Sequence, residues 1–221
     1  MNKCLTAILL ALSATASAQR LQPAPRLVVN ITIDQLRTDY IQAFAPLYGP
    51  DGFKKLLSEG RVYEAASYDF LPIDRASAVA SISSGTTPYY NNIVSSQWLD
   101  RATLRPVYCV ADSKVGTSPR LLSTSTIGDE LKVATGGSAL VYALAFSRDA
   151  AVLSAGHAAD GAVWVDDNRG VLATSAYYPQ KTHKWLNAYN AVYSQRASDD
   201  RTKNLAVAHA AQACVVEQAM G

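Results

Sequence analysis

Apolar and polar positions alternate along the chain in a way that predicts strands separated by helices. Apolar and β-branched residues dominate the run from Leu27 to Ile33, which predicts a strand buried on both faces, as in a central parallel sheet. Residues 61–68 alternate like a second strand. Residues 139–146 predict another buried strand, and residues 162–165 a short one. Residues 171–178 would pair with this last strand, so that five stretches are candidate strands.

Apolar residues at helical spacing lie between these strands. The predicted helices cover residues 40–60, 76–84, 127–134 and 205–220. Ser125 or Thr126 would cap the third helix, and Gly136 with Gly137 would end it. Strands that alternate with helices indicate an α/β fold, with a doubly wound, mostly parallel sheet and helices on both faces. A hairpin over residues 162–178 would form a small cap region.

The two ends of the chain carry further expectations. Residues 1–18 combine a positive start, an apolar stretch and a small-x-small cleavage site, which predicts a secretory signal peptide followed by one domain over residues 19–221. Export would place the protein in the periplasm or outside the cell. No strand follows the last predicted helix, whereas a crossover helix of a parallel sheet normally leads into one. A helix with nothing after it suggests either that the chain is a fragment of a longer protein or that the sheet ends early.

Composition and charge narrow the classes of function. Hydrophobic residues make up 49% of the chain and the formal net charge is +2, as in an ordinary globular protein. The chain has no basic stripe that would indicate binding to nucleic acid. It also has no apolar stretch after the signal peptide that is long enough for a transmembrane anchor. Cys109 and Cys214 are the cysteines of the mature chain, and they could either pair in an oxidising compartment or remain two buried thiols.

Asp34 is the first candidate for chemistry. It directly follows the predicted strand 27–33, so it would lie at the carboxyl end of that strand, where open α/β sheets bind ligands and metals. The alternative is that Asp34 only caps the helix that follows. Spacing alone does not separate these two interpretations.

Short motifs in a fixed order along the chain add to this picture. They are Ile33-Asp34-Gln35-Leu36-Arg37, the segment 80–88, Trp98 with Asp100, Ser118-Pro119-Arg120, the segment 128–131 and the segment 155–164. In this order the motifs resemble the amino-terminal part of secreted bacterial alkaline phosphatases of the type I phosphodiesterase/nucleotide pyrophosphatase group. The resemblance implies the alkaline phosphatase-like fold, of which this chain would be a truncated part.

The resemblance also implies a catalytic plan. Members of the group bind two zinc ions and attack a phosphate ester with a threonine or serine, and two metals can stabilise the attacking and leaving oxygens. Asp34 stands in the place of one zinc ligand. The remaining ligands of the group are aspartates and histidines that would follow residue 221, and zinc takes about four ligands. Zinc is therefore implied for a longer, active form and not for this chain alone.

The nucleophile position departs from the family pattern. Aligning Ala80-Ser81-Ile82 with the end of the nucleophile segment places Arg75 where the threonine belongs. A guanidinium is always protonated and cannot act as a nucleophile. Ser77 lies two residues away and is a weak substitute, because that displacement moves the reacting oxygen by several ångströms.

The phosphate-binding positions differ as well. Ser96 stands where the family has an asparagine, and Ser147 and Asp149 stand where it has a lysine and an arginine. A carboxylate in place of the arginine repels a phosphate dianion. A slip of one residue would let Arg148 take the arginine's place.

These substitutions leave three hypotheses. The first is a catalytically degenerate, exported family member that acts as a binding scaffold for a phosphorylated ligand or an envelope protein. The second is a zinc-dependent phosphoric ester hydrolase, such as an alkaline phosphatase or nucleotide pyrophosphatase, of which this chain is the amino-terminal part, with Asp34 as a zinc ligand and Ser77 as the displaced nucleophile. The third is a purely structural secreted domain.

His157 is interpreted as a packed structural residue.

Overall fold

Residues 25–192 and 199–220 are described by the structure, which is a computed structural model. The signal peptide predicted for residues 1–18 lies outside the described residues. The chain divides into two compact units, Met1–Ile31 with Gly221 and Thr32–Met220. Of the first unit only residues 25–31 are described, and they are exposed and without regular secondary structure.

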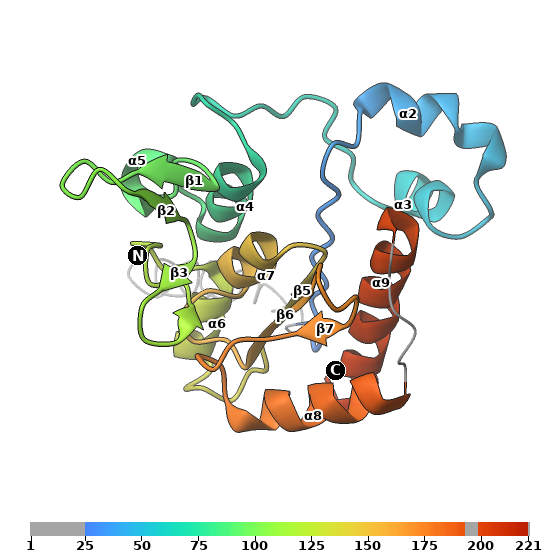
Figure 1. Cartoon of the computed structure of the whole chain (residues 1–221). Coiled ribbons are helices and arrows are strands. Elements are labelled where there is room, and N and C mark those ends of the chain that lie inside the picture. The colour runs from blue at the N-terminus through green and yellow to red at the C-terminus, as the bar shows by residue number, and fades with distance from the viewer. Residues whose placement is uncertain (1–24, 193–198, 221) are drawn as a thin grey trace, which may run out of the picture. The chain divides into compact units, whose positions relative to one another are not determined.

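The second unit begins with a run of helices and continues with short strands; helices and strands then alternate from α6 to β6, and two helices end the unit (Figure 1). The helices are α2 (Thr38–Ala43), η1 (Ala45–Leu47), α3 (Phe53–Glu59), α4 (Arg75–Ser84), α5 (Pro88–Asn91), α6 (Ile127–Ala134), α7 (Arg148–Ala155), α8 (Gln180–Val192) and α9 (Asp200–Glu217). The strands are β1 (Gln97–Leu99), β2 (Pro106–Tyr108), β3 (Ala111–Asp112), β4 (Gly116–Thr117), β5 (Tyr142–Ala145), β6 (Gly161–Val165) and β7 (Leu172–Ala173). β1 pairs with β2 and β3 with β4, both antiparallel. In the third sheet the central strand β6 is parallel to β5 and antiparallel to β7.

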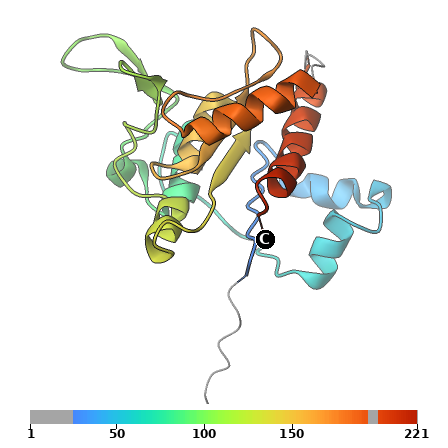
Figure 2. The same cartoon turned by 90° about the horizontal axis from the view of Figure 1, so that it is seen from below.

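The core is centred on β6, whose residues are all buried. Successive side chains of a strand point to opposite faces of the sheet. Accordingly, Ala162 and Trp164 belong to a cluster with α4 and α7, while Val163 and Val165 belong to a cluster with α8 and α9. The sheet therefore lies between α7 on one face and α8 with α9 on the other (Figure 1), and α8 and α9 cover their face when it is seen from below (Figure 2). Helices on both faces of a sheet are what the sequence predicts.

Two of the predicted strands are wrong. Residues 27–33 and 61–68 have no regular secondary structure, and apolar side chains such as Val28, Ile31 and Val62 are exposed. A strand is held by hydrogen bonds to a neighbouring strand, and within the described residues no strand pairs with either segment. Apolar periodicity marks a surface suited to burial, but it does not supply the partner that buries it.

The single helix predicted over residues 40–60 is also wrong. In its place the chain forms α2, η1 and α3. Pro50 has no N–H to continue a helix, and Gly52 has a φ of +67°, which helical residues do not adopt. These two residues separate α3 from the short helices before it.

Other predicted elements are confirmed. α4 and α6 match the helices predicted over residues 76–84 and 127–134, and Thr126 caps α6 by accepting a hydrogen bond from the N–H of Asp129. β5 lies within the strand predicted over residues 139–146. β6 covers the strand predicted over residues 162–165 and begins one residue earlier, and β7 pairs with β6 in the predicted hairpin. α9 begins at Asp200, five residues before the helix expected from the apolar pattern.

The two cysteines of the mature chain are buried free thiols. Cys109 lies in the cluster with α7, and Cys214 lies in the cluster with α8 and α9. Burial, reinforced by the charges of Asp149 and Asp74, raises the pKa of Cys109 to about 12. Burial raises the pKa of Cys214 to about 11. Of the two interpretations of these cysteines, the structure supports separate buried thiols.

Candidate functional site

The N-terminus of α4 is closed by a capping box. Asp74 is the N-cap, and its Oδ1 accepts a hydrogen bond from the N–H of Ser77 at 2.9 Å. The Ser77 hydroxyl accepts a hydrogen bond from the N–H of Asp74 at 2.9 Å and donates one to the Asp74 carbonyl at 3.1 Å. Ser77 is fully buried. Its hydroxyl is therefore part of the helix cap.

The second carboxylate oxygen of Asp74 ties α4 to the segment that leads into β1. It accepts hydrogen bonds from the Ser95 hydroxyl at 2.9 Å and from the N–H of Ser96 at 2.6 Å. Burial alone would raise the pKa of Asp74, but the hydrogen bonds from Ser77, Ser96 and Ser95 outweigh it and lower that pKa below its usual range. The position of Ser96 beside α4 is thus fixed by an ionised carboxylate.

Asp149 brings three of the predicted site positions together. Its Oδ2 lies 3.3 Å from a guanidinium nitrogen of Arg75 and accepts a hydrogen bond from the Ser96 hydroxyl at 3.3 Å. Its Oδ1 accepts a hydrogen bond from the N–H of Ala150 at 2.9 Å. The side chain of Asp149 is fully buried, whereas that of Arg75 is 42% exposed. We refer to Arg75, Asp149 and Ser96 as the Arg75–Asp149–Ser96 network.

Two neighbouring residues do not take over the missing phosphate-binding groups. Ser147 is the N-cap of α7, but its side chain makes no cap hydrogen bond, and its buried hydroxyl has no partner among the described residues. The guanidinium of Arg148 lies 4.7 Å from the ring centre of Tyr108 in a cation–π contact. Arg148 is thus engaged at Tyr108, and Asp149 is the residue that faces Arg75.

Asp34 lies in an exposed turn and not at the end of a strand. Together with Arg75 and Ser96 it lines a cavity of about 630 Å³, whose other walls are largely apolar, with Leu36 and Val79 among them. Burial lowers the pKa of Arg75, but Asp149 and then Asp34 raise it, so that it lies above its ordinary value. The structure therefore places Asp34 within electrostatic reach of the Arg75–Asp149–Ser96 network.

The described residues around Asp34 do not fit a zinc ion. Within residues 25–192 and 199–220, no three carboxylate, histidine or cysteine side chains are grouped closely enough to hold a metal. A zinc ion takes about four such ligands. The guanidinium of Arg75 on the same cavity would also repel a metal cation.

The charges on this cavity disfavour a phosphate dianion. The one cation among its lining residues, Arg75, is already paired with Asp149. Asp34 and Asp74 add two carboxylates to the lining. A phosphate would have to compete with Asp149 for Arg75 and approach two further negative charges, which costs Coulomb energy.

Comparison with known proteins identifies the family. The family model for type I phosphodiesterase/nucleotide pyrophosphatase matches residues 28–216. The chain belongs to this family. It is 37% identical over 177 residues to the alkaline phosphatase PhoV of Synechococcus elongatus, a match that covers 76% of this chain and 32% of PhoV. It is 35% identical over 179 residues to the alkaline phosphatase PafA of Elizabethkingia meningoseptica, covering 76% of this chain and 33% of PafA. The chain thus spans about a third of the length of these relatives.

The fold of this family member is similar to that of PafA. The crystal structure of wild-type PafA superposes with a TM-score of 0.74 at 34% identity, over 77% of this chain and 35% of PafA. The alkaline phosphatase-like fold predicted from the sequence is therefore confirmed. The coverage agrees with a chain that forms only part of that fold.

A second PafA structure bears on the substituted positions. It is the structure of a variant in which a threonine, an asparagine, a lysine and an arginine are replaced. The threonine and asparagine of PafA are as far apart in sequence as Arg75 and Ser96, and the lysine and arginine are as far apart as Ser147 and Asp149. These are the four residue types that the resemblance assigns to the four positions.

His157 and the buried Asp129 form a separate cluster. The ring Nδ1 of His157 lies 3.3 Å from Asp129 Oδ2, and its Nε2 lies 3.0 Å from the carbonyl oxygen of Leu122. The N–H groups of His157 and Ala158 donate to Asp129 Oδ1 at 2.8 and 2.6 Å. These contacts fasten the loop after α7 to α6, which is a structural arrangement.

Sequence reasoning missed Asp74 as a site residue. Its signal is the pattern Asp74-x-x-Ser77 at the start of a helical segment, which predicts a capping box. The pairing of Arg75 with Asp149 has no such signal, because 74 residues separate the two side chains. Local patterns can reveal a cap, but not a contact between distant segments.

The free energy of unfolding is expected to fall at acid pH, in part because Asp129 becomes protonated. Burial would raise its pKa, but hydrogen bonds from Ala158 and Thr126 outweigh burial and lower it below the ordinary value of 3.8. A carboxylate whose folded-state pKa is lowered stabilises the protein above the unfolded-state pKa, and this contribution is lost as pH falls through the folded-state pKa. The Asp129→Asn variant should therefore lose about 1–3 kcal/mol at pH 7.

The measurement for this prediction is the midpoint of thermal unfolding between pH 7 and pH 2. The Asp129→Asn variant should show a shallower fall below about pH 4 than the unchanged protein. Parallel curves for the two proteins would mean that Asp129 does not supply this pH dependence.

Proposed function

We propose that this chain belongs to a catalytically degenerate member of the family that acts as a binding scaffold. The observation that carries the proposal is the Arg75–Asp149–Ser96 network, in which the positions expected to hold the nucleophile and two phosphate-binding groups hold one another. A site whose charges are satisfied internally is not preorganised for a phosphoryl group.

The state of the hydroxyl groups supports the same proposal. Arginine at position 75 cannot be deprotonated to attack a phosphate. Ser77 is fully buried, and its hydroxyl both accepts from the N–H and donates to the carbonyl of Asp74. To act as a nucleophile Ser77 would have to leave the cap of α4, which costs about 1 kcal/mol, and also reach the cavity.

The charges that line the cavity affect which kind of partner the scaffold can bind. A phosphorylated ligand would compete with Asp149 for Arg75 and meet Asp34 and Asp74. An envelope protein that presents a neutral or cationic surface meets no such repulsion. We therefore favour a protein partner over a phosphorylated ligand and propose export as its context. None of the described helices has the length and apolar character needed to cross a membrane.

A zinc-dependent phosphoric ester hydrolase is the second candidate function. It is favoured by the family match and by the coverage, because the chain spans about a third of relatives named as alkaline phosphatases. In this proposal Asp34 would be one zinc ligand, Ser77 would be the nucleophile, and the other ligands would come from a longer form of the protein.

Hydrolysis of p-nitrophenyl phosphate separates the two candidates. The full natural product, incubated with zinc, is expected to show no turnover above the rate with zinc alone, because position 75 offers no nucleophile. The Ser77→Ala variant should therefore behave like the unchanged protein.

The control is the Ser77→Thr variant, which keeps a hydroxyl and the helix cap. Turnover that disappears in Ser77→Ala and survives in Ser77→Thr would overturn the scaffold and establish the hydrolase. A circular dichroism spectrum shared by all three proteins excludes unfolding as the cause of a loss.

A further inference from the structure

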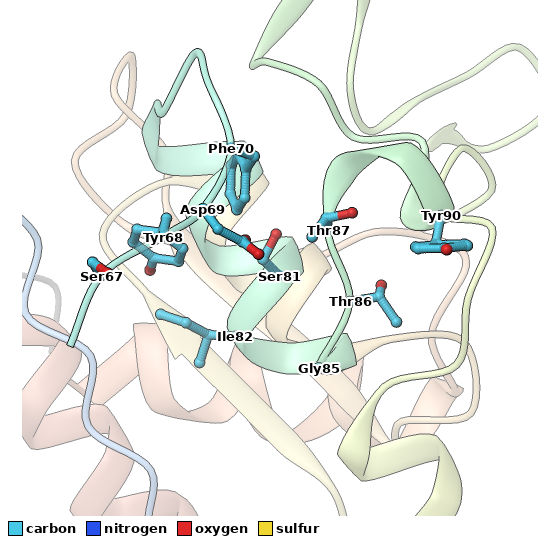
Figure 3. Close-up of a pocket in the computed structure, with 10 residues that line it drawn as sticks. All are labelled: Ser67, Tyr68, Asp69, Phe70, Ser81, Ile82, Gly85, Thr86, Thr87 and Tyr90. Carbon is cyan, nitrogen blue, oxygen red and sulfur yellow. The ribbon is translucent and has the colours of Figure 1, made fainter.

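A second cavity lies along α4, on the side of the segment 67–70. It has a volume of about 480 Å³, is open to solvent, and is bordered on its other side by the turn before α5 (Figure 3). Binding cavities for small molecules usually measure about 300–1,000 Å³. Tyr68 and Ile82 line this cavity and also the cavity at Arg75, so the two are neighbours.

The floor of this second cavity carries a polar group without a protein partner. Ser81 is only 9% exposed, and its hydroxyl has no hydrogen-bond partner among the described residues. Figure 3 shows its side chain directed from α4 toward the side where Asp69 and Phe70 lie. A buried hydroxyl without a partner costs about 1–3 kcal/mol. The hydroxyl is closed off from solvent, so a ligand can bond to it and recover that cost only after the Ser81 side chain turns toward the cavity.

Other groups that can exchange hydrogen bonds surround Ser81. Thr87 is the N-cap of α5, yet its side chain makes no cap hydrogen bond. Asp69 adds a carboxylate, and Tyr90 adds a phenolic hydroxyl. Together these groups offer donors and acceptors at several points of one cavity, as a ligand with many hydroxyls requires.

Aromatic rings form the walls between these polar groups. Tyr68 and Phe70 meet edge to face, with ring centroids 5.2 Å apart and an interplanar angle of 61°. Tyr90 lines the cavity from α5, on the opposite side in the close-up (Figure 3). Aromatic rings are large, stiff apolar surfaces, and the C–H faces of a sugar ring can pack on them.

The charge of the lining excludes anionic ligands. Asp69 is the one charged residue among the residues that line this cavity, and no lysine, arginine or histidine is present among them. A phosphate or carboxylate ligand would be repelled by Asp69 and would find no cation to bind. The charge thus disfavours anions, and the several hydrogen-bonding groups of the lining fit a neutral ligand with many hydroxyl groups.

We propose that this cavity binds a neutral mono- or disaccharide. The Asp69 carboxylate and the Thr87 hydroxyl would exchange hydrogen bonds with sugar hydroxyls, while Tyr68, Phe70 and Tyr90 pack on the ring. This site does not depend on the chemistry of the Arg75–Asp149–Ser96 network, so its test and the hydrolysis test have separate outcomes.

Titration with defined sugars tests the site. Maltose, N,N′-diacetylchitobiose, glucose and glucose 6-phosphate are added to the full natural protein, and binding is followed by saturation-transfer NMR and by chemical-shift titration. At least one neutral sugar is expected to bind saturably below about 10 mM, which is weak but measurable. Glucose 6-phosphate should bind more weakly than glucose because of Asp69.

Adjacent tyrosines provide a matched pair of variants. Tyr89 and Tyr90 are both exposed residues of α5 with ring centroids 5.0 Å apart, but only Tyr90 lines the cavity. Tyr90→Ala and Asp69→Asn are each expected to raise the Kd of the bound sugar about tenfold. Tyr89→Ala should change it by less than about twofold.

Three outcomes would overturn the proposal. They are the absence of saturable binding of every neutral sugar, stronger binding of glucose 6-phosphate than of glucose, and equal effects of Tyr89→Ala and Tyr90→Ala. The first outcome includes the case in which another segment of a longer chain fills the cavity. Unchanged circular dichroism of the variants shows that a loss of binding is not a loss of fold.

Discussion

Replacing Arg75 with methionine is expected to lower the free energy of unfolding by about 3 kcal/mol. The change leaves the fully buried carboxylate of Asp149 without the cation that lies 3.3 Å away. It keeps the N–H of Ala150 and the long hydrogen bond from Ser96, which do not neutralise its charge. The loss lies at the lower end of the range for buried pairs because Arg75 is 42% exposed, so water already screens part of the attraction. Urea denaturation at pH 7 measures it.

An exposed ion pair in the same chain is the matched control. Arg37 and Asp39 lie 2.7 Å apart, closer than Arg75 and Asp149, but their side chains are 66% and 60% exposed. The Arg37→Met variant should therefore lose about 0.5 kcal/mol or less. Equal losses for Arg37→Met and Arg75→Met would show that burial of the carboxylate does not decide the effect.

A double substitution isolates the interaction itself. Arg75→Met combined with Asp149→Asn removes both charges, so no unpaired ion remains buried. Its loss should be smaller than the sum of the two single losses by about 2 kcal/mol, because contacting residues are not additive. Additive losses would mean that Arg75 and Asp149 act on stability independently.

The Gly156→Ala variant is expected to lose about 4 kcal/mol or more, with a melting temperature lowered by about 10 °C. Gly156 has a φ of +79°, and a Cβ there would lie 2.5 Å from Asp129 Oδ2 and collide with the Thr126 hydroxyl. The collision separates the two residues that cap α6. It also disturbs the carboxylate that accepts from the N–H of His157. Thermal unfolding followed by circular dichroism measures the loss.

Gly85 separates the clash from backbone strain. It has a φ of +68°, but no atom lies within 4 Å of a Cβ placed there. Gly85→Ala should therefore lose only the cost of a left-handed residue with a side chain, about 1–2 kcal/mol. A loss as large as that of Gly156→Ala would attribute both effects to strain and none to the Thr126–Asp129 cap.

The sequence predicts those elements whose ends are marked by neighbouring residues. α6 starts at the Thr126–Asp129 cap and ends before Gly136, which has a φ of +58°. α7 carries no such mark, since the hydroxyl of its N-cap Ser147 makes no cap hydrogen bond, and the sequence pattern does not reveal it. A sequence pattern predicts an element only where the signal is local. α7 lacks such a signal, because it is held by packing on β5, β6 and α4.

The segment around His183 is a second case in which the sequence pattern does not predict the structure. Its polar residues favour a solvated loop, but it forms the first half of α8. There the ring Nε2 of His183 lies 3.0 Å from the carbonyl oxygen of Ser175. Trp185 and Leu186 of the same helix are buried against the sheet. A few apolar residues on one face suffice for burial, even where the average composition is polar.

The sequence identifies the positions of the candidate site but does not predict which of their side chains contact each other. The resemblance marks Arg75, Ser96 and Asp149 one at a time as departures from the family. That these three side chains contact each other depends on the packing of α4 against α7, which brings distant segments together. The sequence predicts Asp34 at the end of a strand. The structure places it in a turn, because no strand among the described residues pairs with residues 27–33.

The Arg75–Asp149 pair constrains how the protein could have evolved. If an ancestor carried the threonine and arginine usual in the family, either substitution made first produced an unfavourable intermediate. Asp149 beside threonine is a buried carboxylate without its cation, and Arg75 beside arginine places two guanidinium groups together. The same intermediates stand in the way of a return. The low stability of either intermediate therefore opposes a return to threonine and arginine, independently of any selection for catalysis.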